Sequence, residues 1–159
     1  MNSTIVEPVR LASWNDADGV LKLCHQLEQE NAVFPMSEEK VKCKLRQAFD
    51  RQLAICGVIG PPNDLRGSIF LEIGTSWYSD RFGLYELWNF VHPEHRRSNY
   101  AKTLIDFAKT CALQLNLPLQ IGIFSSKRTA EKIRLYERQL GTSVVGAFFI
   151  YNGKTGLDG

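Results

Sequence analysis

Residues 91–101, VHPEHRRSNYA, separate two segments of different periodicity, and this junction constrains the fold more than any other part of the chain. The apolar and aromatic run over 84–91 is typical of a strand, whereas residues 101–115 repeat apolar side chains at helical spacing. A polar loop that enters a helix exposes unpaired backbone N–H groups at the positive end of the helix dipole, where an anion binds favourably. Arg96 and Arg97 add positive charge here, so the junction is a candidate phosphate-binding loop.

This loop differs from the common nucleotide-binding loops, because the junction has neither GxxxxGK[ST] nor GxGxxG spacing. It resembles instead the acyl-CoA signature of the GCN5-related N-acetyltransferases, V-x-P followed by [QR]-x-x-G-x-[GA]. Val91, Pro93 and Arg96 match this signature, and so does Ala101. Asn99 stands where the family usually has glycine, and asparagine can enter the left-handed region of the backbone at modest cost.

The resemblance implies that the chain binds acetyl-CoA. In this family the loop N–H groups hold the CoA pyrophosphate, and the preceding strand binds pantetheine. Carried over residue by residue, the resemblance gives the cofactor-binding candidates Phe90, Val91, Arg96, Arg97, Ser98, Asn99, Tyr100, Ala101 and Thr129. Thr129 takes the place of an Asn that contacts CoA in the family. The alternative is that Arg96 and Arg97 form a basic pair on the surface.

Length and composition set outer limits. A chain of 159 residues with 44% hydrophobic and 23% charged residues fits one domain over 1–159. Its net charge of +2 is small for a dedicated nucleic-acid binder, so no nucleic-acid partner is expected. No apolar stretch approaches the roughly 18 residues of a membrane span, and the N-terminus lacks a signal-peptide pattern. We therefore expect a cytoplasmic protein without a membrane partner.

The four cysteines, at 24, 43, 56 and 111, are widely spaced and form no CxxC or Cys/His ligand cluster. Free buried thiols in a reducing compartment are expected, with disulfides as the alternative. No metal site is predicted.

Periodicity and turn residues predict the order of elements. In chain order we expect a strand over 5–12, helices over 15–31 and 37–49, strands over 53–59, 67–73 and 84–91, a helix over 101–115, a strand over 119–124, a helix over 126–140 and a last strand over 143–151. Asn15 and Ser37 are the expected N-caps of the first two helices, Ser125 or Ser126 that of the fourth, and Gly141 its C-terminal stop.

The order β-α-α-β-β-β-α-β-α-β is that of the acetyltransferase fold, an α/β (α+β) architecture with a mixed sheet. Only about ten strand-like residues remain at the end, where the family usually has two strands. The last strand is therefore short, incomplete or supplied by a partner chain, and a homodimer is possible.

A second resemblance concerns the helix that ends in LYERQLG, because many members of the family carry a tyrosine there. Tyr136 matches this tyrosine, which protonates the departing CoA thiolate, and a phenol is a suitable donor for that step. The helix has one more residue before Gly141 than the family usually has. The alternative is an amphipathic Tyr whose hydroxyl reaches the surface.

Transfer to an amine also needs a base and a polarised thioester carbonyl. Backbone N–H groups of the strand over 84–91 can polarise the carbonyl. Glu86 lies where several family members have a catalytic glutamate, and a carboxylate on a half-buried strand has a raised pKa. Glu72 on the neighbouring strand, His92 and His95 are further candidates.

The leading hypothesis is an acetyl-CoA-dependent N-acetyltransferase in which a small-molecule or peptide amine attacks the thioester directly in a ternary complex. The alternatives are a non-catalytic acyl-CoA-binding relative and a nucleic-acid module. The sequence does not identify the acceptor. Trp77 and Tyr78 could form a wall of its pocket, or they belong to the core or a subunit contact.

Overall fold

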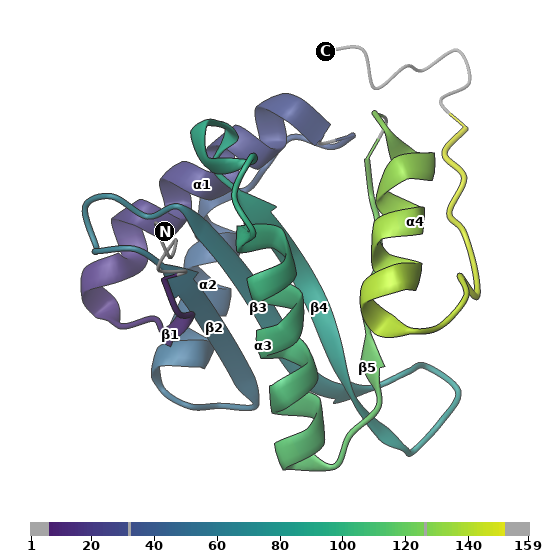
Figure 1. Ribbon diagram of the computed structural model, residues 1–159. Coiled ribbons are helices and arrows are strands. Elements are labelled where there is room, and N and C mark those ends of the chain that lie inside the picture. Colours follow the sequence, from purple (N-terminus) through teal and green to yellow (C-terminus); the bar gives the residue numbers. More distant parts are fainter. Residues whose placement is uncertain (1–6, 32, 126, 152–159) are drawn as a thin grey trace, which may run out of the picture.

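The computed structural model describes residues 7–31, 33–125 and 127–151, and it has the layered α/β architecture expected from the sequence (Figure 1). Its elements are β1 (Arg10–Leu11), a 3-10 turn (Trp14–Asp16), α1 (Ala17–Asn31), α2 (Glu38–Phe49), β2 (Ala54–Ile59), β3 (Gly67–Thr75), β4 (Phe82–Val91), a second 3-10 turn (Pro93–His95), α3 (Tyr100–Leu115), β5 (Leu119–Gln120) and α4 (Thr129–Leu140). The strands form one sheet in the order β1-β2-β3-β4-β5. All neighbours are antiparallel except β4 and β5, which are parallel as expected.

Helices cover both faces of the sheet. Helices α1 and α2 lie on one face over a core that includes Phe70 and Trp88, and α3 lies on the other over Ile69 and Leu84. Neighbouring residues of a strand point to opposite faces, so the continuous apolar runs of β2 and β3 supply both cores.

The first helix begins differently from the expectation. Ser13, and not Asn15, caps the first turn, which is a 3-10 turn, and α1 continues from Ala17. Asp16 fixes this start because its carboxylate accepts hydrogen bonds from the Ser13 backbone N–H at 2.8 Å and from Arg10 at 2.7 and 2.8 Å.

The expected Ser37 cap of α2 is confirmed, since its hydroxyl accepts a hydrogen bond from Lys40 N at 3.4 Å. Of the strand expected over 5–12, residues 5 and 6 lie outside the described residues, and among the others only Arg10–Leu11 form a strand.

Strand β4 carries an extra residue relative to β3. Phe70 pairs with Trp88, but Leu71 pairs with Glu86, which leaves Leu87 as a β-bulge. A bulge changes which side chains face each side of the sheet. Trp88 and Phe90 consequently face the α1 layer, whereas Leu84 belongs to the α3 layer.

Strand β5 is shorter than the expected 119–124. Leu84 pairs with Leu119 and Tyr85 with Gln120, and among the described residues the two strands make no further pairs. Beyond this point the chain runs through 121–125 to α4, which begins at Thr129 and not at residue 126. Arg128 takes the capping position expected for Ser125 or Ser126, and Gly141 ends the helix in the left-handed conformation, as expected.

The expected last strand is not formed. Residues 143–151 have no regular secondary structure and are exposed along their length, on the side of α4 away from α3 (Figure 1). Val145 is 98% and Phe149 95% exposed. Their side chains favour a strand, but a strand also needs a neighbouring strand for its backbone hydrogen bonds, and none lies beside this part of the described chain.

In the described part of the chain, no helix is long and apolar enough to cross a membrane. The four cysteines are free thiols, as expected, and three of them are buried; Cys43 is exposed, which differs from the expectation.

Candidate functional site

The main cavity lies where β4 and β5 part. Its volume is about 1160 Å³, and its walls come from β4, the 122–125 segment, α4, the end of α1 and the start of α2. Because the parallel pairing stops after Tyr85 and Gln120, the remainder of β4 faces this cavity instead of a neighbouring strand. The junction 91–101 contributes Val91, Arg96 and Ala101 to the same cavity.

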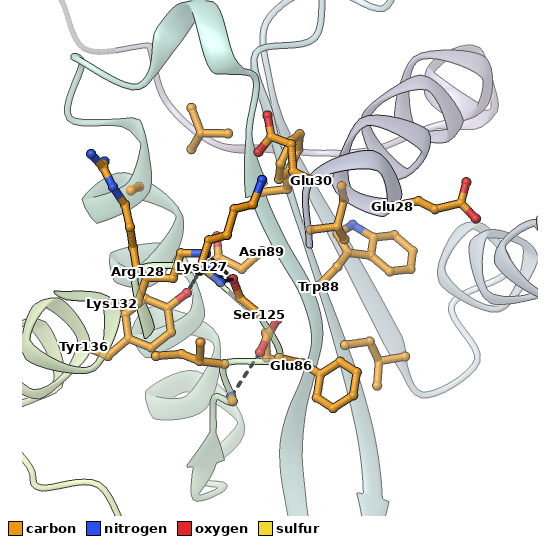
Figure 2. A pocket seen from close by; sticks show the side chains of 18 of the residues that line it. Glu28, Glu30, Glu86, Trp88, Asn89, Ser125, Lys127, Arg128, Lys132 and Tyr136 are labelled. Atoms are coloured by element: carbon orange, nitrogen blue, oxygen red, sulfur yellow. Dashed lines mark hydrogen bonds between the residues drawn. The ribbon is translucent and has the colours of Figure 1, made fainter. Parts of the chain in front are cut away.

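Glu86 projects into the cavity from β4, near the point of divergence (Figure 2). Its carboxylate accepts a hydrogen bond from the backbone N–H of Gly122 at 3.1 Å. Burial raises the pKa of Glu86 to about 7, and the Gly122 hydrogen bond offsets this rise only in part. A carboxylate that titrates near neutrality can exchange a proton at physiological pH.

Tyr136 projects from α4 toward the same region (Figure 2). Its hydroxyl oxygen accepts a hydrogen bond from the side-chain amide of Asn89 at 3.3 Å. Burial, together with the nearby charge of Glu86, raises the pKa of Tyr136, so the phenol stays protonated. Since Asn89 occupies a lone pair of the oxygen, the hydroxyl hydrogen remains available for donation.

A cluster of basic residues occupies another side of the cavity, where α4 begins (Figure 2). Lys132 donates a hydrogen bond to the Ser125 hydroxyl at 2.9 Å. Burial lowers the pKa of Lys132, and the positive charges of Arg96 and Arg128 lower it further, with Glu30 acting in the opposite direction. A place where neighbouring positive charges lower the pKa of a lysine is a suitable environment for an anion. We call Arg96, Lys127, Arg128 and Lys132 the basic cluster.

The cofactor-binding candidates fall into two groups. Phe90, Val91, Arg96 and Ala101 line the cavity, whereas Arg97, Ser98, Asn99, Tyr100 and Thr129 are outside its lining. The Arg96 guanidinium lies 5.3 Å from the centre of the Phe90 ring and forms an ion pair with Glu30.

Local geometry explains three of the residues outside the lining. The buried Tyr100 hydroxyl accepts a hydrogen bond from Arg66 at 3.2 Å, on the α3 side. Asn99 precedes α3 with φ −85° and ψ 16°, so it does not use the left-handed conformation that the family's glycine suggested. Thr129 donates its hydroxyl to the Ser125 carbonyl at 2.9 Å, one turn before α4.

The other sequence candidates lie outside the main cavity. Glu72 forms an ion pair with Lys44 in a second, smaller depression. Trp77 and Tyr78 contact each other edge to face, and Trp77 is 96% exposed.

His92 and His95 belong to the 91–101 junction. Together with Glu94 they bring potential ligand atoms within 4.8 Å of one another, as a metal site requires. However, His92 Nδ1 accepts a hydrogen bond from Glu94 N at 3.2 Å, and its Nε2 lies 3.1 Å from the Gln26 amide nitrogen. His92 could bind an ion only by giving up one of these contacts.

Three residues of the site do not follow from the sequence reasoning. Asn89 contacts Tyr136, and Lys132 contacts Ser125. The Gly122 N–H contacts Glu86. Asn89 carries a weak signal, since it is an amide in an otherwise apolar stretch of a strand. The role of Gly122 depends on how β4 and β5 diverge, which no local pattern encodes.

No protein-family model matches the chain, and no curated protein sequence matches it. Solved structures, in contrast, do match the chain. AAC(6')-Iy in complex with the bisubstrate analogue CoA-S-monomethyl-acetylneamine matches with a TM-score of 0.71 at 12% identity, over 94% of this chain and 99% of that one. Glucosamine-6-phosphate N-acetyltransferase from Arabidopsis thaliana matches with a TM-score of 0.69 at 13% identity, over 94% and 99% of the two chains. An aminoglycoside 6'-N-acetyltransferase from Acinetobacter haemolyticus matches with a TM-score of 0.67 at 17% identity, over 92% and 97%.

The chain therefore has the fold of the N-acetyltransferases, and the fold expected from the resemblance to the GCN5-related family is confirmed. One of these neighbours is in complex with a CoA analogue.

Proposed function

We propose that this protein transfers an acetyl group from acetyl-CoA to a primary amine by direct attack in a ternary complex. The observation that carries the proposal is the pairing of Glu86 and Tyr136 in one cavity. Burial raises the pKa of Glu86 to about 7 and also raises that of Tyr136, so one group can accept a proton while the other holds one. Separate acid and base groups are what acyl transfer from a thiol ester to an amine needs.

The charge along one side of the cavity supports acetyl-CoA as the ligand. The basic cluster offers positive charge for the CoA phosphates, and the start of α3 adds its backbone N–H groups. Phe90 and Val91 of β4 lie between this region and Glu86 along the strand, beside the proposed path of the pantetheine arm. In this assignment the Arg96 guanidinium, which has several N–H donors, binds a phosphate while its Nη2 keeps the ion pair with Glu30.

In the proposed reaction each residue has one role. Glu86 takes a proton from the ammonium form of the acceptor, and the free amine attacks the thioester carbonyl carbon. The bulge residue Leu87, which lacks a partner in β3 and lines the cavity, is the candidate backbone donor to the carbonyl oxygen. The C–N bond forms, the C–S bond breaks, Tyr136 protonates the departing thiolate, and the surplus proton on the new amide nitrogen then restores the Tyr136 phenol. Asn89 positions the Tyr136 hydroxyl for this step.

Direct transfer is favoured over an acyl-enzyme because the one cysteine in the described lining is a poor nucleophile. Cys24 is 5% exposed, and burial raises its pKa to about 12. The thiolate needed for attack is therefore scarce at neutral pH. We expect the reaction to occur in the cytoplasm.

Two measurements on the full chain test the proposal. Acetyl-CoA should raise the thermal unfolding midpoint, because a ligand at about 100 times its Kd stabilises the folded state by about 2.7 kcal/mol. A panel of primary amines with acetyl-CoA should release free CoA thiol above the rate of hydrolysis. Stabilisation without transfer to any amine would select the non-catalytic acyl-CoA-binding alternative. Absence of both effects would reject acyl-CoA as the ligand.

A further inference from the structure

We propose that the acceptor is a monoamine with an apolar, preferably aromatic, body, and that Phe34 and Phe124 select it. This inference rests on the proposed function, because it assigns the part of the cavity that the basic cluster and Glu86 leave free. It differs from that function in excluding the polycationic amines as preferred acceptors.

The wall of the cavity that lies across from the start of α4 is apolar. It comes from the end of α1, the connection to α2, the start of α2, the α1-facing side of β4 and the 122–125 segment, and it includes Leu27, Phe34, Met36, Val41, Trp88 and Phe124. Figure 2 shows Trp88 on this side, with Arg128 and Lys132 on the other and Glu86 between them. An acceptor amine bound at Glu86 would therefore place its body against apolar side chains, where burial of apolar surface favours binding.

The charges of the cavity point to one cationic group in the acceptor. The cavity has four carboxylates in the described lining, and three of them lie within 4 Å of a basic side chain. Glu30 pairs with Arg96, and Glu131 lies 3.8 Å from Arg128.

The Glu28 carboxylate also has partners. Its carboxylate accepts a hydrogen bond from the Met36 backbone and lies 3.6 Å from His25. In Figure 2 it points away from Tyr136 and Glu86. Among the described residues, Glu86 is thus the lining carboxylate without an ion pair. A second buried ammonium would find no free carboxylate, and an unpaired buried charge is costly.

Phe34 and Phe124 form an aromatic contact between segments that are far apart in the sequence. Their rings stack with centroids 6.3 Å apart and an interplanar angle of 13°. Phe34 is 52% and Phe124 48% exposed, and neither belongs to the two buried core clusters. Half-exposed aromatic rings in a cavity wall offer faces and edges on which a ligand ring can pack.

The test compares acceptors at saturating acetyl-CoA. We expect kcat/KM for 2-phenylethylamine to exceed that for ethanolamine by about 30-fold, the effect of burying an aromatic ring at this site. Spermidine should be poorer than 2-phenylethylamine. Equal or faster turnover of spermidine would overturn the inference and leave the proposed function intact.

A double variant, Phe34→Ala with Phe124→Ala, tests the two residues. It should raise the KM for 2-phenylethylamine roughly tenfold, leave the KM for acetyl-CoA unchanged, and keep the folded circular dichroism spectrum. The matched control is Trp77→Ala, which removes an exposed aromatic side chain outside the cavity lining. An unchanged KM for 2-phenylethylamine in the double variant would overturn the assignment of these residues.

Binding provides a readout independent of transfer. Trp88 lies in the apolar wall, so saturable binding of 2-phenylethylamine to the CoA-bound protein should change tryptophan fluorescence, and the double variant should weaken it. No saturable change at millimolar amine would contradict the inference. Failure of acetyl-CoA to bind or to release thiol would instead contradict the proposed function, so the two failures are distinguishable.

Discussion

At the scale of single residues, Glu86 combines two contacts that can be separated by substitution. Its carboxylate is the proposed base, and it also accepts the Gly122 N–H hydrogen bond. Glu86→Gln keeps an oxygen that can accept from Gly122 but removes the basic group. We expect turnover to fall by about 10² to 10⁴ while acetyl-CoA affinity is unchanged.

The raised pKa of Glu86 fixes the direction in which kcat/KM should change with pH. Because the pKa of Glu86 is raised to about 7 and the deprotonated form is active, kcat/KM of the unmodified protein should rise with pH through about 7. Glu86→Gln should lack this limb. Parallel pH profiles for both proteins would show that another group titrates.

Tyr136→Phe tests the proton donor. The phenyl ring keeps its packing, while the hydroxyl that Asn89 positions is lost. Turnover should fall by about 10² to 10⁴ with little change in acetyl-CoA affinity, because the donated proton matters only in the transition state. Tyr78→Phe, which alters an exposed hydroxyl outside the cavity, is the control and should behave as the unmodified protein. If the two variants have equal turnover, water or the acceptor supplies the proton.

At the scale of elements, the contact between Arg10 and Asp16 joins β1 to the start of α1. Asp16 is fully buried, and Arg10 also donates to the Gly60 carbonyl at 2.8 Å, after β2. Burial alone would raise the pKa of Asp16, but hydrogen bonds from Arg10 and Ser13 outweigh it and lower the pKa. Asp16→Ala should lower the free energy of unfolding by about 2 kcal/mol or more, as measured by urea denaturation.

The lowered pKa of Asp16 fixes how its contribution to the free energy of unfolding changes with pH. The contribution of Asp16 is fully present above the pKa it has in the unfolded chain, and it is lost as pH falls through the lower folded value. The difference in stability between the two proteins should therefore shrink in acid. Asp18→Ala, an exposed change in the same helix, is the control, and an equal loss in that variant would contradict the role of Asp16.

The elements also show which signals the sequence contains. Helices α1 to α4 and the three long strands follow from periodicity, because each is decided by which face of its own residues is apolar. The Ser13 cap was not predicted, since it depends on Arg10 meeting Asp16 in space. The length of β5 and the absence of a strand over 143–151 depend on pairing between distant segments, and both runs are strand-like in isolation.

The same distinction applies to the candidate site. Glu86 and Tyr136 came from the resemblance to a family, and whether they act stays a prediction. Asn89 and the basic residues of α4 became candidates only when the fold brought them to one cavity. Of the loop residues, Arg96 lines the cavity and Arg97 does not, a difference that adjacent positions in a sequence do not encode.

At the scale of the whole molecule, the 143–151 segment is an exposed apolar run along the outer side of α4. Large exposed apolar surface favours association with another chain. We expect sedimentation velocity to show association that increases with protein concentration and is reduced in the double variant Val145→Lys with Phe149→Lys. The thermal midpoint of the dilute protein should not fall, because both side chains are almost fully exposed. A lower midpoint at low concentration would mean that these side chains pack within the chain.

Where β4 and β5 diverge, the sheet loses backbone hydrogen bonds between the two strands, and the cavity forms in their place. Each further pair would add backbone hydrogen bonds, which contribute about 0.5 to 1.5 kcal/mol apiece, yet the Gly122 N–H binds the Glu86 carboxylate instead. A Cβ at Gly122 would meet nothing within 4 Å, so crowding is not what keeps a strand-forming residue out of this position. Repairing the sheet here with β-branched residues would close the cavity as it strengthened the fold. A screen for thermostability alone would thus select against the site, and thermostable variants of this segment should be checked for acetyl-CoA binding before they are kept.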